Sequence, residues 1–217
     1  YFGEKAIPSD TLALIGTMID TLSAKHVKPN EFQSAIEKQL PELVRFIREK
    51  NLLYLDSTKP LVVRKEPAYM AGVAGASISS PGPYDKEGNT YYNVGSLEGW
   101  PAARAESYLR EYNYYILQIL NIHEAIPGHY TQLVYANRSP SIIKSIFGNG
   151  AMVEGWAVYT EQMMLYAGYA HPLPFTFCLC LLLEGLFGQQ VQALFFRHIA
   201  GMHAVIQYSI AYSAQVP

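Results

Sequence analysis

A histidine and a glutamate stand side by side near the middle of the chain, at positions 123 and 124, and a second histidine follows at position 129. The pair ends an apolar stretch with a helical pattern, which places an imidazole and a carboxylate on one helical turn. Zinc peptidases of the H-E-x-x-H type use this chemistry, with two histidines that bind zinc and a glutamate that activates water. His123, Glu124 and His129 are therefore the first candidates for a catalytic metal site.

The spacing of the two histidines differs from that motif, in which they lie four residues apart. Pro127 occupies the fourth position after His123, and His129 occupies the sixth. On an ideal helix six residues correspond to about 600° of rotation and about 9 Å of rise, too far for two ligands of one zinc ion. Proline interrupts a helix and glycine tolerates unusual backbone angles, so Pro127-Gly128 predicts a bend that returns His129 toward His123.

A third ligand is expected from a neighbouring helix, because a catalytic zinc site holds three protein ligands and keeps one position open. Glu154 follows His129 by 25 residues, enough for a helix, a turn and a returning helix. Glu161 lies seven residues further on nearly the same helical face, where it could orient a ligand histidine without touching the metal. Gln132, one turn after His129, is a second candidate for such an outer contact.

The spacing alone leaves a second interpretation open. His123 and Glu124 could cap the C-terminus of a helix, with Glu154 paired to a surface cation. Against this, two carboxylates on the otherwise apolar helix around Trp156 are costly to bury without a cation, and zinc would supply one.

Two longer motifs resemble a known bacterial family. They are His-Glu-Ala-Ile-Pro-Gly-His-x-x-Gln at 123–132 and Val-Glu-Gly-Trp-Ala-x-Tyr-x-Glu at 153–161, and the stretch 84–93 with Thr-Tyr-Tyr-Asn is also similar. They resemble the family catalogued as domain of unknown function 885, grouped with the gluzincin-like zinc metallopeptidases, over about residues 60–170. The resemblance implies His123, His129 and Glu154 as zinc ligands and Glu124 as catalytic base. It also implies an edge strand before the active-site helix, along which an extended peptide lies.

The elements that must position these residues are mostly helical. Apolar residues recur with a helical period at 12–22 and 30–50, and Pro41 should kink or divide the second of these helices. Pro101 can open a long helix that continues to Pro127, and further helices are expected to about Asn137 and at 150–168.

Short β-rich segments precede the long helix. Strands are predicted at 61–65, 68–80 and 90–94, and the last two should form an antiparallel pair with a long connection. The fold class is therefore mostly α with a small antiparallel β-sheet (α+β), with a gluzincin-like metallopeptidase core implied by the resemblance. We expect three segments: a helical one at 1–60, the metallopeptidase-like core at 61–170, and an apolar helical tail at 171–217 whose role is open.

Composition excludes several other classes. Half of the 217 residues are hydrophobic, 16% are charged and the net charge is −2, which argues against a disordered chain, a coiled coil and a nucleic-acid-binding protein. The run Leu173–Leu183 is shorter than a membrane span requires, so a membrane partner is not expected. The chain begins at Tyr1 without a signal-peptide pattern, and we expect an incomplete core cut from a longer protein. The sequence leaves open whether that protein is secreted, periplasmic or lipid-anchored.

The sequence thus predicts a zinc metallopeptidase that hydrolyses peptide bonds, with Zn²⁺ as cofactor and a peptide as substrate. The alternative is a non-catalytic metallopeptidase-like fragment or a helical binding protein. Peptide specificity, oligomeric state and compartment are left open by the sequence.

Overall fold

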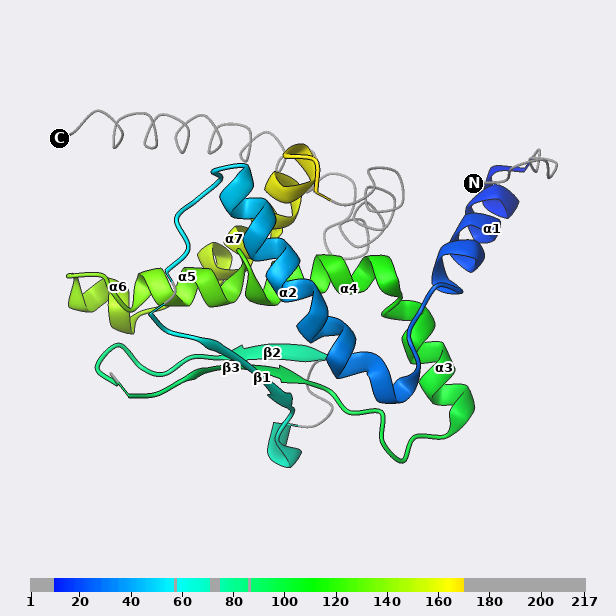
Figure 1. Ribbon diagram of the computed structural model, residues 1–217, viewed down its shortest axis with the longest axis horizontal. Helices are drawn as coiled ribbons and strands as arrows, with labels where there is room; N and C mark the ends of the chain where they lie inside the picture. The colour runs from blue at the N-terminus through cyan, green and yellow to red at the C-terminus, as the bar shows by residue number, and fades with distance from the viewer. Residues whose placement is uncertain (1–9, 57, 71–74, 86, 170–217) are drawn as a thin grey trace. The chain divides into compact units, whose positions relative to one another are not determined.

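The computed structural model describes residues 10–56, 58–70, 75–85 and 87–169. In this part of the chain, helices pack on one face of a three-stranded sheet, which confirms the predicted α+β class (Figure 1). The predicted tail at 171–217 lies outside the described residues. None of the described helices is long and apolar enough to cross a membrane.

Two helices predicted from periodicity open the described part of the chain. They are α1 (Thr11–Ser23) and α2 (Phe32–Glu49), with the short 3₁₀ helix η1 (Pro29–Glu31) between them. Of the two predicted effects of Pro41, a kink or a division, the division is wrong, because α2 runs through this residue without a break. Pro41 lies on the exposed side of α2, and the opposite side buries the residues Phe32, Ile36, Gln39, Leu43 and Ile47.

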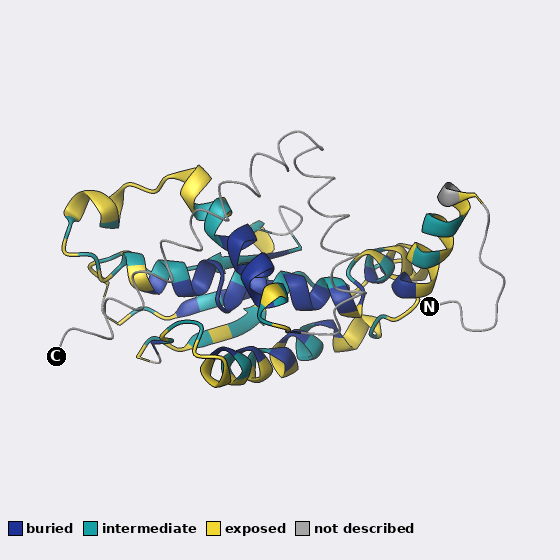
Figure 2. Cartoon of the chain, turned by 90° about the horizontal axis from the view of Figure 1, so that it is seen from above, coloured by how far each residue is buried: buried dark blue, intermediate teal, exposed yellow. Residues whose placement is uncertain are grey.

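The core lies between α2, the sheet and the helices that follow it (Figure 2). Large side chains that are fully buried come from each of these elements, and they include Phe32, Ile36, Tyr92, Leu117, Ile122 and Met164. Because the core joins segments from residue 32 to residue 164, it fixes the central helices relative to the sheet.

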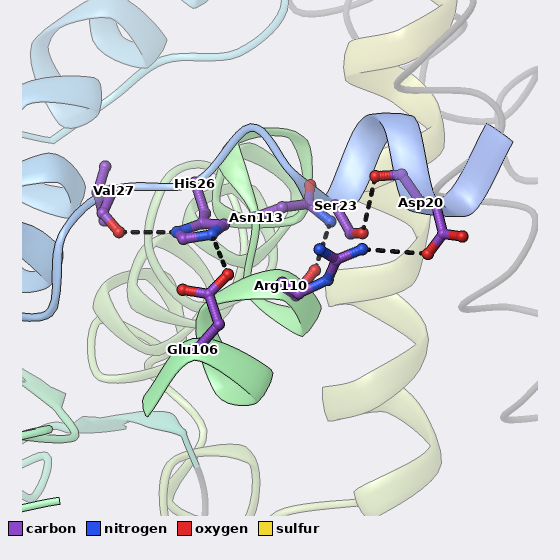
Figure 3. A network of polar contacts seen from close by, with 7 residues as sticks. All are labelled: Asp20, Ser23, His26, Val27, Glu106, Arg110 and Asn113. Carbon is purple, nitrogen blue, oxygen red and sulfur yellow. Dashed lines mark hydrogen bonds and ion pairs between the residues drawn. The ribbon is translucent and has the colours of Figure 1, made fainter. Parts of the chain in front are cut away.

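Helix α1 is tied to α3 (Ala102–Glu111) by polar contacts (Figure 3). Arg110 pairs with Asp20 at 3.1 Å, and Nε2 of His26 lies 3.0 Å from Glu106. The chain after α1 is also held by the backbone, since the amide of Tyr114 donates to the carbonyl of Lys25. These contacts are partly exposed, so we assign them to the scaffold.

The sheet contains β1 (Leu61–Lys65), β2 (Ala76–Ser79) and β3 (Thr90–Val94) in the order β1-β3-β2. The predicted antiparallel pair is confirmed, with Ile78 opposite Tyr92. The predicted strand at 68–80 is too long, because 68–70 form a 3₁₀ helix and the strand covers 76–79. The sheet is mixed, however, because β1 runs parallel to β3. Parallel neighbours need a long connection, and the segment between β1 and β3, with the 3₁₀ helix η2 (Ala68–Met70) and β2, provides it.

The long helix expected between Pro101 and Pro127 is divided. Helix α3 ends at Glu111, α4 (Tyr114–Leu120) begins after Asn113, and a π-helical turn, η3 (Asn121–Ala125), follows directly. Asn113 causes the division, because its side chain accepts hydrogen bonds from the amides of Tyr115 and Ile116 and so caps a new helix.

Three helices complete the described part of the chain. They are α5 (His129–Ala136), α6 (Ile142–Ile146) and α7 (Gly150–Tyr166). Two of them were predicted, and α6 was not. Helix α7 packs against η3 and α5, and this packing places Glu154 and Glu161 beside the histidines.

Candidate metal centre

The backbone bends sharply between the two histidines. After the π-turn η3, the Ile126–Pro127 peptide bond is cis, and the amide of Gly128 donates to the carbonyl of Ile122 at 2.9 Å. A Cβ atom at position 128 would overlap the carbonyl oxygens of Ile122 and His123, so this close approach requires glycine. The predicted bend at Pro127-Gly128 is therefore present.

Asn121 holds the beginning of this bend. It is fully buried, its Oδ1 atom accepts from the hydroxyl of Tyr92 at 3.0 Å, and its Nδ2 atom donates to Oε1 of Gln39 at 2.8 Å. One side chain thus joins the π-turn to β3 and α2. Buried polar groups that are satisfied in this way specify a single arrangement of their elements.

The bend brings together three side chains that can bind a metal ion. The ligand atoms of His123, His129 and Glu154 all lie within 4.8 Å of one another. Oε2 of Glu154 lies 3.5 Å from Nε2 of His123 and 3.7 Å from Nε2 of His129. Ligands of a tetrahedral zinc ion are about 3.4 Å apart when each bond is about 2.1 Å long, and the two separations from Glu154 are close to this value.

The charge state of His129 also suits a ligand. Burial lowers the pKa of His129 and the neighbouring His123 lowers it further, so the imidazole is neutral at physiological pH. A neutral imidazole can donate its lone pair to a metal. The side chain of Glu154 is 62% exposed, so this side of the group is open to solvent.

Glu161 contacts the first histidine from the side away from Glu154. Its Oε1 atom lies 2.6 Å from Nδ1 of His123, and its side chain is only 6% exposed. Burial lowers the pKa of His123, but the hydrogen bond and charge of Glu161, with the charges of Glu124 and Glu154, raise it above the ordinary value. Glu161 therefore lies where an outer contact was predicted.

Glu124 follows His123 on the π-turn. Burial raises the pKa of its carboxyl to about 7, with further contributions from the charges of Glu154 and Glu161, while His123 acts in the opposite direction. A carboxylate with a pKa close to the working pH can both accept and return a proton. This property is the one that a catalytic base needs.

Two side chains connect the bend to α7. The indole N–H of Trp156 donates to the carbonyls of Pro127 and Gly128 at 3.0 and 3.2 Å. The side-chain amide of Gln132 donates to the carbonyl of Met152 at 3.1 Å. Gln132, the second residue predicted to support a ligand without touching the metal, thus contacts the first turn of α7. The role of Trp156 was missed, although it stands two residues after Glu154 in the motif quoted above.

A large groove lies elsewhere in the described part of the chain. It has a volume of about 1130 Å³ and lies between the ends of β1 and β3 and helix α3, where Trp100, Arg104 and Tyr108 line it. None of the three candidate ligands lines this groove.

The fold and this centre define an α+β protein in which a bent helix and a neighbouring helix bring two histidines and a glutamate together. The chain belongs to the bacterial family described as "Bacterial protein of unknown function (DUF885)", whose model matches residues 8–177. This confirms the family resemblance of the two motifs. No curated protein matches the chain.

Two solved structures are similar to the chain. One is "a putative lipoprotein of unknown function from Shewanella oneidensis", with 59% identity and a TM-score of 0.72 over 82% of this chain and 32% of that one. The other is "the putative lipoprotein from Colwellia psychrerythraea", with 20% identity and a TM-score of 0.60 over 85% of this chain and 29% of that one. At 20% identity the second likeness concerns the fold alone. The chain spans about a third of the length of these proteins.

Proposed function

We propose that this part of the protein carries the active site of a zinc-dependent peptidase. The observation that supports the proposal is the convergence of His123, His129 and Glu154 around one position, next to a glutamate whose pKa is raised to about 7. Two imidazoles and a carboxylate are a ligand set used by catalytic zinc sites. A zinc ion held by these residues would supply the Lewis acidity that amide hydrolysis requires.

Glu124 is the general base in this proposal. Its carboxylate takes a proton from the attacking water molecule and delivers it to the nitrogen of the leaving amine. The raised pKa makes the carboxylate a stronger base than an ordinary glutamate, and the same property makes the carboxylic acid able to return the proton near neutral pH. Glu161 keeps the Nδ1 proton on His123, so that Nε2 is free to act as a ligand.

An extended peptide is the proposed substrate, and β2 is its docking edge. Among the described residues, β2 pairs with β3 on one side only, and it packs against the π-turn that carries His123 and Glu124. A peptide that adds to this edge would gain main-chain hydrogen bonds and would lie beside the candidate centre. This arrangement agrees with the edge strand that the family resemblance implied.

The proposal extends to a gluzincin-like mechanism with an altered ligand spacing. In the common motif the two histidines lie four positions apart on a regular helix. Here a π-turn and the bend at Gly128 take up the two additional residues and return His129 to His123. The chemistry of the ligand set is thereby retained although its spacing in the sequence differs.

The test compares the full chain with the Glu124→Gln variant. We expect both proteins to bind one zinc ion per chain, measured by metal analysis after dialysis. We expect the wild type to cleave peptides from a mixed library, and the variant to be slower by several orders of magnitude, because the base is lost while the ligands remain.

A matched control is Glu106→Gln, which alters the glutamate of the His26–Glu106 pair on α3 and should leave cleavage unchanged. A wild type that holds no zinc, or a Glu124→Gln variant as fast as the wild type, would refute the proposal. Zinc binding without any cleavage would support the non-catalytic alternative instead.

A further inference from the structure

Two buried polar atoms beside the candidate centre lack hydrogen-bond partners. They are Nδ1 of His129 and Oε1 of Gln132, and neither is exposed to solvent. An imidazole that binds a metal through Nε2 carries its proton on Nδ1. A buried N–H group without an acceptor destabilises the folded protein, so this proton requires a partner when the metal is bound.

Gln132 is the candidate for this partner. It follows His129 by three residues on α5, and side chains with this spacing share a face of a helix. Its Nε2 atom donates to the carbonyl of Met152, which fixes the orientation of the amide and leaves Oε1 as the end that can accept. Oε1 of Gln132 is thus a buried acceptor without a partner, one turn from a buried donor without a partner.

We propose that Gln132 is a positioning residue that accepts the Nδ1–H of His129 and ties this ligand to the helix that carries Glu154. The Met152 carbonyl belongs to the first turn of α7, two residues before Glu154. The side-chain amide of Gln132 therefore sets both the orientation of His129 and the position of Glu154. The inference rests on the metal site of the proposed function and does not depend on peptide cleavage.

Two variants separate the acceptor role from a purely structural one. Gln132→Ala removes both hydrogen bonds and should weaken zinc binding about 10- to 100-fold, the usual effect of losing an outer partner. Gln132→Glu keeps an acceptor for His129 but loses the donor to Met152. It should recover most of the lost affinity. If Gln132 only joined the two helices, both variants would bind zinc equally weakly.

Gln118 provides a matched control. It is a buried glutamine on α4 whose Oε1 atom also lacks a partner, and it is not one of the residues grouped around the metal position. Gln118→Ala should change the stability of the fold without changing zinc affinity.

The direct readout is the imidazole N–H proton, followed by NMR in the zinc-loaded full chain. From the candidate centre we expect two slowly exchanging N–H signals, one from His123 with its partner Glu161 and one from His129. The Gln132→Ala variant should lose only the second signal, and Gln132→Glu should retain it. Unchanged zinc affinity together with an unchanged His129 signal in Gln132→Ala would overturn the inference, whereas a wild type that binds no zinc would overturn the proposed function.

Discussion

Nδ1 of His123 lies 2.6 Å from Oε1 of Glu161, and this contact joins the π-turn to the middle of α7. The other nitrogen of the same ring lies 3.5 Å from Glu154. The imidazole is thus held between two carboxylates of one helix, of which one is buried and one is exposed. A ligand histidine supported by a buried carboxylate has a fixed orientation and a more basic lone pair.

Replacing Glu161 should therefore weaken metal binding. We expect zinc affinity to fall about 10-fold in Glu161→Gln, which retains an acceptor without a charge, and up to about 100-fold in Glu161→Ala. In the metal-free variants the pKa of His123 should decrease, because burial, which lowers it, is no longer opposed by Glu161. Competition with a zinc chelator and an NMR titration of His123 measure the two effects.

Glu106→Gln is the control for this series, since it alters another His–Glu pair whose carboxylate is 54% exposed. It should change neither zinc affinity nor the titration of His123. Equal zinc affinities for the wild type and Glu161→Ala would contradict the role given to Glu161.

The Glu124→Gln variant should be more stable than the wild type when no metal is bound, and the difference should depend on pH. Between the ordinary value of 4.5 and the raised pKa of about 7, the folded protein retains a proton on Glu124 that the unfolded chain has lost. The stability of the wild type therefore falls as the pH rises through this range. The variant lacks this titration and should gain on the order of 1–3 kcal/mol above the range and little below it.

Urea unfolding of the metal-free proteins at about pH 4 and about pH 8 measures this difference. A stability difference that is the same at both pH values would contradict the raised pKa of Glu124.

Gly128→Ala should disrupt the bend. The new Cβ atom would overlap the carbonyl oxygens of Ile122 and His123, so the backbone must shift. We expect a loss of more than about 2 kcal/mol in the free energy of unfolding and a loss of zinc binding, because His129 moves away from His123. Thermal unfolding and metal analysis measure both.

Gly155→Ala is the matched control on α7, because a Cβ atom there meets nothing within 4 Å. It should raise stability by up to about 1 kcal/mol through helix propensity and leave zinc binding unchanged. Equal stability and equal zinc binding in the two glycine variants would contradict the role given to the close backbone approach at Gly128.

Trp156→Phe should loosen the contact between the bend and α7. The phenyl ring cannot donate to the carbonyls of Pro127 and Gly128, and the lost hydrogen bonds should cost about 1 kcal/mol. Zinc affinity should fall by less than about 10-fold, the effect expected for a residue that hydrogen-bonds a ligand histidine, because Trp156 contacts only the backbone of the bend. Trp100→Phe, in the groove beside α3, is the control and should leave zinc affinity unchanged, as measured by the same chelator competition.

The sequence by itself determined the local elements and the residues of the candidate centre. The strands at 61–65 and 90–94 and helices α1, α2 and α7 follow from periodicity, which is a property of neighbouring residues. His123, Glu124, His129 and Glu154 were selected by the chemistry of their side chains and by two motifs. The need for a bend at Pro127-Gly128 followed from the length of a helical turn.

Tertiary structure decided what depends on distant residues. The parallel pairing of β1 with β3 and the cap at Asn113 that divides the long helix were not predicted. The same is true of the contact of Trp156 with the bend and of the network that holds Asn121 between α2 and β3. These features arise because packing brings together residues that are tens of positions apart, and local pattern carries no information about which of them will meet.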